Sequence, residues 1–289
     1  MKKCLIVINN MSGRSAKIDE TKLREKFSAA YDVAVVRITE QDDVWSPFGY
    51  DLVVACGGDG TFNRALNACA ECGVNLIYYG FGTFNECAKA KGTRHRESAF
   101  IRLYEYAEAN DRYFGYVAAA GSFTPLGYVV DVRKKQKMGV LAYLLEVVKQ
   151  YKVYRIPAEI EADGETFKGD YTLIMAIDSM RCFGFRFNRL YRADDGKVHL
   201  LLVKSPRVRG LLGKIAIFFP LFRAFFMGFG KEVHGDKLVF KAVSDLKIKL
   251  FAPETFDVDG DAVNFAGDVF IRVRKPANEV YIGDFERMN

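Results

Sequence analysis

Short apolar runs alternate with helical patterns over the first third of the chain, and this alternation constrains the fold more than any other feature. The predicted strands cover residues 4–8, 33–37, 51–56 and 75–79, and the predicted helices cover residues 18–30, 62–70, 85–90 and 97–109. Strands separated by helices are typical of βαβ units, which build a mainly parallel sheet. The sequence therefore predicts a Rossmann-like α/β domain over residues 1–116.

The pattern changes after residue 116. Strand-like runs follow at residues 128–132, 158–162, 171–177, 198–203, 237–243, 246–251 and 269–273. Asp-Gly turns at Asp163, Asp195 and Asp259 separate several of them, which is typical of an antiparallel β-sandwich. Helical stretches at residues 138–151 and 211–229 interrupt the strands. We expect a β-rich second domain over residues 117–276, with residues 277–289 as a candidate to pack back on the first domain.

Composition excludes several classes of protein. Hydrophobic residues make up 50% and charged residues 27% of the 289 residues, so the chain is expected to fold. The six cysteines lack the spacing of a disulfide framework, and no apolar run reaches the roughly 18 residues of a spanning helix. We expect reduced thiols and a cytoplasmic location. A net charge of +6 suits nucleotides, nucleic acid or acidic lipid headgroups without choosing among them.

A glycine turn, Gly57–Thr61, follows the predicted strand at residues 51–56 and opens a helix. Glycines at the carboxyl end of a parallel strand let the backbone approach a phosphate chain, and a helix N-terminus offers N–H groups to it. Asp59 would repel phosphates unless a divalent cation lies between them, so the turn indicates a metal nucleotide. The alternative is a tight strand-to-helix turn that binds nothing. Neither a P-loop nor a Rossmann fingerprint is present, which disfavours P-loop hydrolases and dehydrogenases.

Four motifs in this order resemble those of the diacylglycerol kinase catalytic domain family, which includes bacterial soluble lipid kinases and sphingosine kinases. Gly57–Thr61 with Asn63 is similar to G-G-D-G-T-x-N. Residues 9–13 resemble N-P-x-S-G, residues 80–85 resemble P-x-G-T-x-N, and residues 259–261 resemble D-G-E. Together the motifs span most of the chain.

The resemblance implies a two-domain kinase that binds ATP and Mg²⁺ on the α/β domain, at a cleft facing the second domain, and phosphorylates a hydroxyl of a membrane lipid, diacylglycerol by default. The residues that it implies at the nucleotide are Asn9, Asn10, Ser12, Gly13, Thr39, Gly57, Gly58, Asp59, Gly60, Thr61, Asn63 and Thr83. It implies Asp259, with Asp261 beside it, as the base for the lipid hydroxyl. Metal ligands are implied at Asp59 and, for a structural Mg²⁺, at Asp195 with backbone oxygens near Arg192 and Lys197.

The chain departs from the family pattern at several positions. Arg64 stands where the family has Glu, which reverses a charge near the phosphates. Proline is absent at Asn10 and Gly80, and Asp261 is one methylene shorter than the family Glu. Arg64 leaves open a changed substrate or a lost activity. Asp-Gly is also the commonest hairpin turn signal, so Asp259 has a purely structural alternative.

Residues 205–231 form a basic and aromatic segment without an acidic residue. Its members are Arg207, Arg209, Lys214, Arg223 and Lys231, and Phe218, Phe219, Phe222, Phe225, Phe226 and Phe229. Such a segment suits reversible docking at an anionic membrane surface, and the alternative is a helix buried against the second domain. A second basic cluster at residues 133–137 is either a solvated loop or a further lipid contact.

The leading hypothesis is therefore an ATP-dependent lipid kinase, cytoplasmic and reversibly bound to the membrane. One alternative is a NAD kinase relative, against which the motif at residues 82–85 and the basic phenylalanine segment argue. The other is a pseudokinase that binds lipid or nucleotide without turnover. No helix-turn-helix, RRM or zinc-finger pattern is present, so we expect no nucleic-acid partner. A homodimer is left open.

Overall fold

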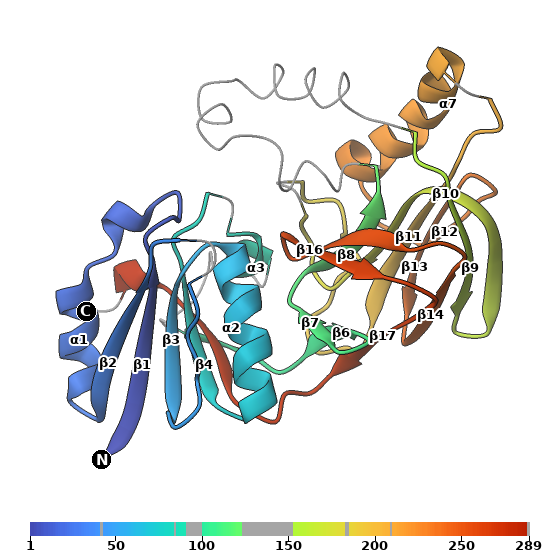
Figure 1. Cartoon of the computed structure of the whole chain (residues 1–289). Coiled ribbons are helices and arrows are strands. Elements are labelled where there is room, and N and C mark those ends of the chain that lie inside the picture. The colour runs from blue at the N-terminus through green and yellow to red at the C-terminus, as the bar shows by residue number, and fades with distance from the viewer. Residues whose placement is uncertain are drawn as a thin grey trace. The chain divides into compact units, whose positions relative to one another are not determined.

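The computed structural model describes residues 1–40, 43–83, 85–90, 100–122, 153–182, 185–208 and 210–287. The chain divides into two compact units, one made of Met1–Tyr106 with Lys275–Asn289 and the other of Ala107–Arg274 (Figure 1). The domain limits predicted from the sequence, residues 116 and 276, lie somewhat later along the chain than these divisions.

The first unit contains a six-stranded sheet in the order β2-β1-β3-β4-β18-β5. Its strands are β1 (Lys2–Asn9), β2 (Tyr31–Ile38), β3 (Leu52–Gly57), β4 (Asn75–Gly80), β5 (Phe100–Leu103) and β18 (Val280–Gly283). All neighbours in this sheet are parallel except β18 and β5, which are antiparallel. The last strand in the sequence thus lies inside the sheet that the first strands begin.

Helices cover both faces of this sheet. The helices of the first unit are η1 (Ser15–Lys17), α1 (Glu20–Ser28), α2 (Asp59–Cys72), α3 (Glu86–Ala90) and η3 (Phe285–Arg287). On one face, Leu23 and Phe27 of α1 pack in a core with alternate residues of β1 and β3. On the other face, Phe62 of α2 packs on Tyr78 of β4, with ring centroids 4.9 Å apart. Because α2 begins at the end of β3, the packing of α2 fixes the glycine turn between them.

The helix predicted at residues 97–109 is wrong. The described part of this stretch forms β5 and, after it, β6 (Tyr106–Ala109). Ile101 and Leu103 are buried whereas Arg102 between them is exposed, which is the period of two that a strand shows. Hydrogen bonding of β5 to β18 gives this stretch its partner, and β18 comes from residues almost at the other end of the chain.

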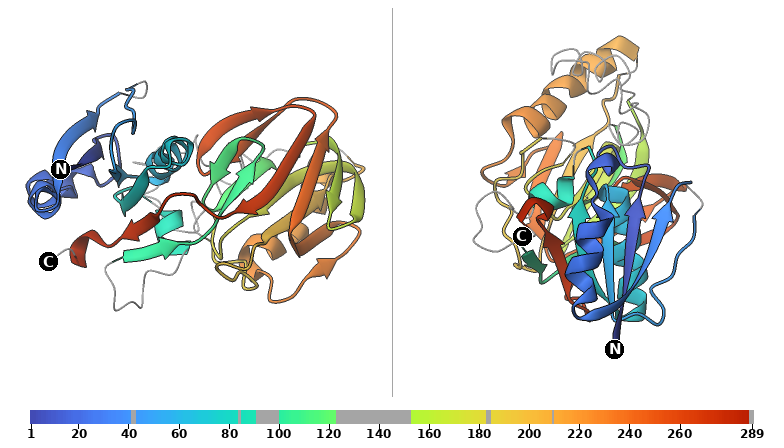
Figure 2. Two further views of the ribbon diagram at one scale, coloured as in Figure 1. Left: turned by 90° about the horizontal axis from the view of Figure 1, so that it is seen from below. Right: turned by 90° about the vertical axis from the view of Figure 1, so that its left-hand side faces the viewer.

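The second unit is built of antiparallel strands. They are β6, β7 (Arg112–Phe114), β8 (Val117–Gly121), β9 (Ile156–Ala162), β10 (Glu165–Ile177), β11 (Val198–Lys204), β12 (Val233–His234), β13 (Leu238–Val243), β14 (Asp245–Leu250), β15 (Glu254–Val258), β16 (Asp261–Phe265) and β17 (Asp268–Arg274). The long strand β10 pairs with β9 through its first half and with β8 through its second half. A branch β8-β15-β16 thereby leaves the main sheet (Figure 2). One hydrophobic core of the unit collects alternate residues of β8, β9, β10 and β11.

The fold class predicted from the sequence, a parallel α/β sheet followed by an antiparallel β-sandwich, is confirmed. A helix also lies between β11 and β12: α7 (Gly210–Phe222), followed by the π-helical turn η2 (Arg223–Met227). No helix among the described residues has the length and apolar character needed to cross a membrane. The predicted strand at 128–132, the basic cluster at 133–137 and the predicted helix at 138–151 fall outside the described residues.

Candidate functional site

Four loops of the first unit follow the carboxyl ends of β1, β2, β3 and β4. Parallel strands point the same way, so these loops share one edge of the sheet, which we call the carboxyl edge. The described residues of these loops are 9–14, 39–40, 43, 57–61, 80–83 and 85. Every residue predicted at the nucleotide lies in one of these loops or, for Asn63, just after one on α2.

The glycine turn after β3 is tightly closed. Gly58 is the N-cap of α2, and Asp59 is the first helical residue. Any Cβ on Gly57 would collide with the Thr61 side chain, and a Cβ on Gly82 would lie 2.6 Å from the Gly58 Cα. Two glycine-containing loops therefore meet backbone to backbone at Gly58 and Gly82, and a side chain at Gly82 would force them apart.

Asn85 organises the loop after β4. Its Oδ1 accepts the backbone N–H of Gly82 at 2.6 Å, and its Nδ2 donates to the Gly80 carbonyl at 3.1 Å. Asn85 is buried and has a φ of +49°, a conformation that Asn tolerates better than most residues. The Arg14 Nε donates to the Gly82 carbonyl at 3.0 Å. Arg14, which lies in the loop after β1, therefore holds the loop after β4 in place.

Further hydrogen bonds join the loops after β1, β3 and β4. The Nδ2 of Asn9 donates to the Thr61 Oγ1 at 2.8 Å. The backbone N–H of Phe81 donates to the Gly57 carbonyl at 2.6 Å. The carboxyl edge is thus a connected network of short polar contacts, which gives a ligand a fixed set of backbone groups.

The carboxylate of Asp59 links the glycine turn to α3. Its Oδ1 accepts the backbone N–H of Cys87 at 3.1 Å. Burial raises the pKa of Asp59, and the backbone N–H groups of Glu86 and Cys87 act in the opposite direction. Part of this carboxylate is therefore used to hold the next loop, and the role of Asp59 as a metal ligand stays a prediction.

Arg64 lies beside the loop after β2. Its guanidinium donates to the Asp43 carbonyl at 3.5 Å. The Asp43 carboxylate in turn accepts the backbone N–H of Thr39 at 2.6 Å and that of Glu40 at 2.9 Å. These N–H groups, with a smaller contribution from Arg64, lower the pKa of Asp43. The residue that departs from the family pattern is thereby tied to the loop that carries Thr39.

The remaining residues predicted at the nucleotide differ in exposure. Asn10 and Gly13 are exposed, Ser12 and Thr83 are half-buried, and the side chain of Asn63 is buried. The N–H of Asn10 donates to the Ile38 carbonyl at 3.0 Å, which joins the loop after β1 to the end of β2.

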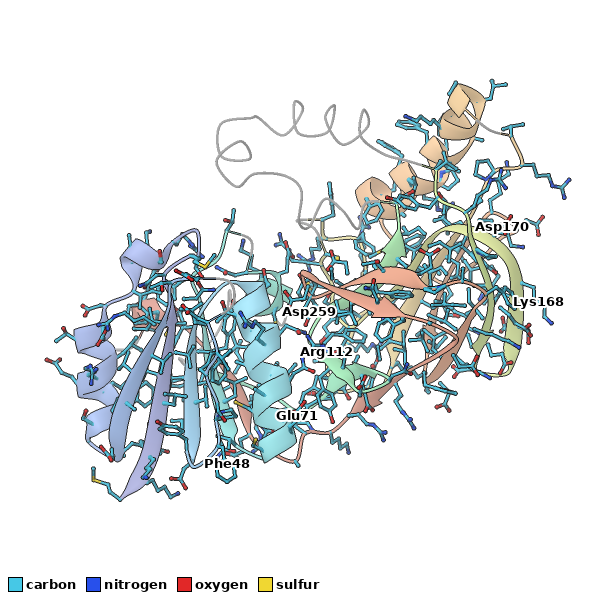
Figure 3. All side chains as sticks on the ribbon, viewed as in Figure 1. Phe48, Glu71, Arg112, Lys168, Asp170 and Asp259 are labelled. Atoms are coloured by element: carbon cyan, nitrogen blue, oxygen red, sulfur yellow. The ribbon has the colours of Figure 1, made fainter. Side chains whose placement is uncertain are left out.

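In the second unit, Asp259 and Gly260 form the two-residue turn between β15 and β16, with φ values of +53° and +100°. The Asp259 side chain is 0% exposed. Its Oδ2 accepts the N–H of Gly115 at 2.5 Å, and its Oδ1 accepts those of Tyr116 and Val117, both at 3.0 Å. Figure 3 labels this residue. The carboxylate therefore fastens the hairpin to the chain that enters β8, and its role as a base stays a prediction, as does that of the half-buried Asp261.

Asp195 is exposed in the second unit, and its Oδ1 accepts the N–H of Lys197 at 3.1 Å. Among the residues that the structure describes, no three His, Cys, Asp or Glu side chains gather where they could hold a metal ion. A magnesium ion that arrives with a nucleotide needs only one or two protein carboxylates, because phosphates and water complete its shell. Asp59 is the residue predicted to supply such a carboxylate, and this role and the structural ion at Asp195 both stay predictions.

The sequence reasoning missed two residues that shape the carboxyl edge. Asn85 belongs to a recognised motif but was not assigned to the site, although an Asn between glycine turns is a signal for a left-handed residue. Arg14 follows the first motif directly, and nothing in its spacing shows that its side chain reaches the loop after β4.

Comparisons with known proteins show what this chain is similar to. Residues 3–106 match the sequence profile of the diacylglycerol kinase catalytic domain. A diacylglycerol kinase of Bacillus subtilis is 24% identical over 282 residues, which cover 90% of each chain. One from Staphylococcus saprophyticus is 26% identical over 226 residues, 73% of this chain and 70% of its own. A crystal structure of a diacylglycerol kinase from Bacillus anthracis superposes with a TM-score of 0.65 at 18% identity, covering 99% of this chain and 98% of that one, which shows a shared fold.

Proposed function

From the match of residues 3–106 to the diacylglycerol kinase catalytic domain, a domain of lipid kinases, we propose that this chain transfers the γ-phosphate of ATP to a hydroxyl of a membrane lipid. Diacylglycerol is the default acceptor, because it is named for the relatives that match most of the chain. The observation that carries the proposal is the backbone contact between the glycine loops at Gly58 and Gly82.

Phosphoryl transfer asks the protein mainly for positioning and for charge that neutralises the phosphates. The first turn of α2, which begins after Gly58, supplies unpaired backbone N–H groups and a partial positive charge at the carboxyl edge. The hydrogen bonds from Asn9 to Thr61 and from Phe81 to Gly57 hold this turn in place before any ligand arrives. A helix turn that is held in place before the ligand arrives suits the triphosphate of ATP.

Magnesium would lower the repulsion between the phosphates and Asp59 and supply positive charge to the transferred group. A carboxylate offers about four acceptor positions on its two oxygens. The backbone N–H groups of Glu86 and Cys87, with a smaller contribution from that of Asn85, use up to three of them. Asp59 is thus the acidic side chain of the carboxyl edge that we propose as a magnesium ligand.

For the lipid hydroxyl we propose Asp259 as the base, with Asp261 beside it. A carboxylate within hydrogen-bond reach of the alcohol is sufficient for this task. Asp259 is buried and accepts three backbone N–H bonds, so the role requires that its carboxylate become accessible when the lipid binds.

One assay tests the proposal against its alternatives. The purified chain is incubated with γ-labelled ATP and Mg²⁺, either with mixed micelles that contain diacylglycerol or with NAD. Label in the extracted lipid supports a lipid kinase, and label in the dinucleotide supports a NAD kinase relative. If calorimetry detects no affinity for ATP with or without Mg²⁺, the proposal is wrong.

The second candidate is a pseudokinase. Two observations favour it: Arg64 reverses a charge near the predicted phosphates, and the buried Asp259 carboxylate already accepts three backbone N–H groups. ATP binding by calorimetry without label transfer to any lipid would select this candidate.

A further inference from the structure

Helix α7 carries apolar side chains on two sides. One side is buried in the second unit: Ile217 is 2% exposed and Leu221 is 4% exposed. The other side is open: Phe219 is 71% exposed and Leu212 is 67% exposed. We call the exposed set the outward face; its members are Leu212, Ile215, Phe218, Phe219 and Phe222.

The segment that follows α7, η2 and the residues after it, anchors the end of the helix. The Phe225 ring packs on that of Phe187, with centroids 5.4 Å apart, and Phe229 stacks on Phe240 at 4.0 Å. The N–H of Phe229 donates to the Phe187 carbonyl at 2.7 Å. The outward face is therefore not needed to attach the helix, and its phenylalanines contact one another, with Phe218 5.5 Å from Phe219 and 5.8 Å from Phe222 between ring centroids.

The outward face forms one continuous stripe. At 3.6 residues per turn its five members span an arc of about 120° around the helix axis. The described residues leave this stripe exposed, although apolar side chains in such a number are normally covered. Figures 1 and 2 show α7 at one end of the second unit, beyond its strands.

Basic side chains lie along the borders of the stripe. Lys214 precedes Phe218 by one helical turn, and the exposed Arg223 follows Phe222 directly. Arg189 donates a hydrogen bond to the carbonyl of Met227, which places a third cation next to the end of the helix. Residues 205–231 contain no acidic residue. An apolar aromatic stripe bordered by cations matches the hydrocarbon boundary and the headgroups of an anionic membrane.

We propose that the outward face of α7 docks on an anionic lipid bilayer, with its phenylalanines at the acyl boundary and the bordering cations at the headgroups. Charge complementarity selects this occupant, because an apolar protein partner would not require the surrounding cations. The proposal deepens the proposed function, since a kinase of membrane lipids must work at that surface. It is tested by binding alone, so the two can fail separately.

The first test is flotation with vesicles of phosphatidylcholine alone or with about one-third phosphatidylglycerol. We expect flotation with the mixed vesicles and at least tenfold weaker binding, ~1.4 kcal/mol, for the double variant Phe219→Ser, Phe222→Ser. Arg223→Glu should lose most of its preference for phosphatidylglycerol. The variants change exposed side chains, so near-UV circular dichroism and calorimetry with ATP should match the wild type.

The matched controls are Phe48→Ser and Lys2→Glu, which change one exposed phenylalanine and one exposed cation in the first unit. Both should float like the wild type. Equal flotation of the double variant and the wild type would overturn the proposal. So would a dimer in light scattering that the double variant splits, because the outward face would then be a contact between two copies. Flotation without lipid phosphorylation would contradict the proposed function but not the docking of α7 on the membrane.

The second test asks what touches Phe219. Trp45 is the single tryptophan, so Phe219→Trp in a Trp45→Phe background gives one reporter. Vesicles of brominated phosphatidylcholine and phosphatidylglycerol should quench its emission, whereas Phe48→Trp in the same background should stay bright. Blue-shifted emission without vesicles, together with no quenching, would mean that protein covers the face and would refute membrane docking.

Discussion

At the residue scale, the carboxyl edge depends on positions where a single atom decides the geometry. Asn85 holds the loop after β4 through both ends of its amide, and Gly58 and Gly82 let the two loops touch. These three residues set the shape of the loops, and none of them needs a side-chain contact with a ligand. Replacing them should therefore move the backbone groups of the carboxyl edge rather than remove a side chain that binds the ligand.

Gly82→Ala tests this close approach. The new Cβ would lie 2.6 Å from the Gly58 Cα, so one loop must shift. We expect a loss of roughly 1–3 kcal/mol in the free energy of unfolding, typical of overpacking, and at least tenfold weaker ATP binding. Urea unfolding and calorimetry measure the two effects. Gly230→Ala is the control, since nothing lies within 4 Å of its added Cβ. Wild-type ATP affinity for Gly82→Ala would contradict the close-approach argument.

Arg64→Glu restores the charge that the family pattern has at this position. The variant removes the contact with the Asp43 carbonyl and places a second negative charge beside the Thr39 loop. Because Arg64 is exposed, the free energy of unfolding should change by less than about 0.5 kcal/mol. We expect a severalfold higher KM for ATP, measured by initial rates, and no change for the exposed control Lys2→Glu. A lower KM would mean that Arg64 opposes nucleotide binding.

The motifs predicted where several residues lie in the fold, whereas their contact with a nucleotide stays a prediction. Gly57, Gly58 and Thr61 lie together at the carboxyl edge, as motif spacing and the end of a buried strand imply. Arg14 could not be found in this way, because its partners are carbonyls of a loop that is remote in sequence. Contacts of a long side chain with distant backbone carry no sequence signal.

At the scale of secondary-structure elements, Asp259 attaches the β15–β16 hairpin to residues 115–117. In Asp259→Asn an amide NH₂ replaces one acceptor oxygen, so at least one buried N–H loses its partner. We expect a loss of about 1–3 kcal/mol in the free energy of unfolding, measured with urea. The control Asp163→Asn alters an exposed Asp-Gly turn of the same kind and should cost less. An equal cost for both would contradict the special role of the buried turn.

The histidine of β11 should make the second unit sensitive to acid. His199 is buried and stacks on Phe240, and burial lowers its pKa from 6.5 to about 4, against the attraction of Asp195 and Glu232. Between these values the unfolded chain binds a proton that the folded chain does not, so stability falls as pH decreases. From pH 7 to pH 5 we expect a loss of roughly 2 kcal/mol, measured by urea unfolding.

His199→Phe keeps an aromatic ring on β11 and removes the titrating group. The difference in stability between pH 7 and pH 5 should shrink in this variant. The exposed His234 is the control, because His234→Phe should leave the difference unchanged. An unaltered pH dependence in His199→Phe would assign the acid sensitivity to other groups.

Helix α7 shows what the sequence of a single element cannot predict. An apolar stretch at residues 211–229 predicts a helix, but it leaves open which apolar residues face the core. The structure separates Ile217 and Leu221, which are buried, from Phe219 and Leu212, which are exposed. The choice depends on the partners Phe187 and Phe240, which come from other parts of the second unit.

At the scale of the whole molecule, the fold class followed from the alternation of strands and helices in the first third and from the Asp-Gly turns after it. The resemblance to diacylglycerol kinases is confirmed for residues 3–106. The sequence could not show the order of strands in the first sheet. The helix predicted at 97–109 is wrong for a related reason. This stretch forms β5 by pairing with β18, which is remote in sequence.

Removal of residues 277–289 tests the insertion of β18. Val280 and Ile282 are fully buried, and β18 pairs with both β4 and β5. Without this strand the two neighbours present unpaired edges, which favours aggregation. We expect the truncated chain to be insoluble or to lose ATP binding, as judged by size-exclusion chromatography and calorimetry. A chain that lacks only residues 288–289 is the control, and a monomeric, ATP-binding truncation at 276 would refute the prediction.

The position of β18 also sets an order of events during synthesis. The chain leaves the first unit after Tyr106 and returns to it at Lys275. On the ribosome, every strand of the second unit is therefore synthesised before β18. Until then the first sheet lacks the strand that lies between β4 and β5. The carboxyl edge should consequently reach its final structure last, and a message cut short before β18 should yield a product that has assembled the second unit but not a complete first sheet.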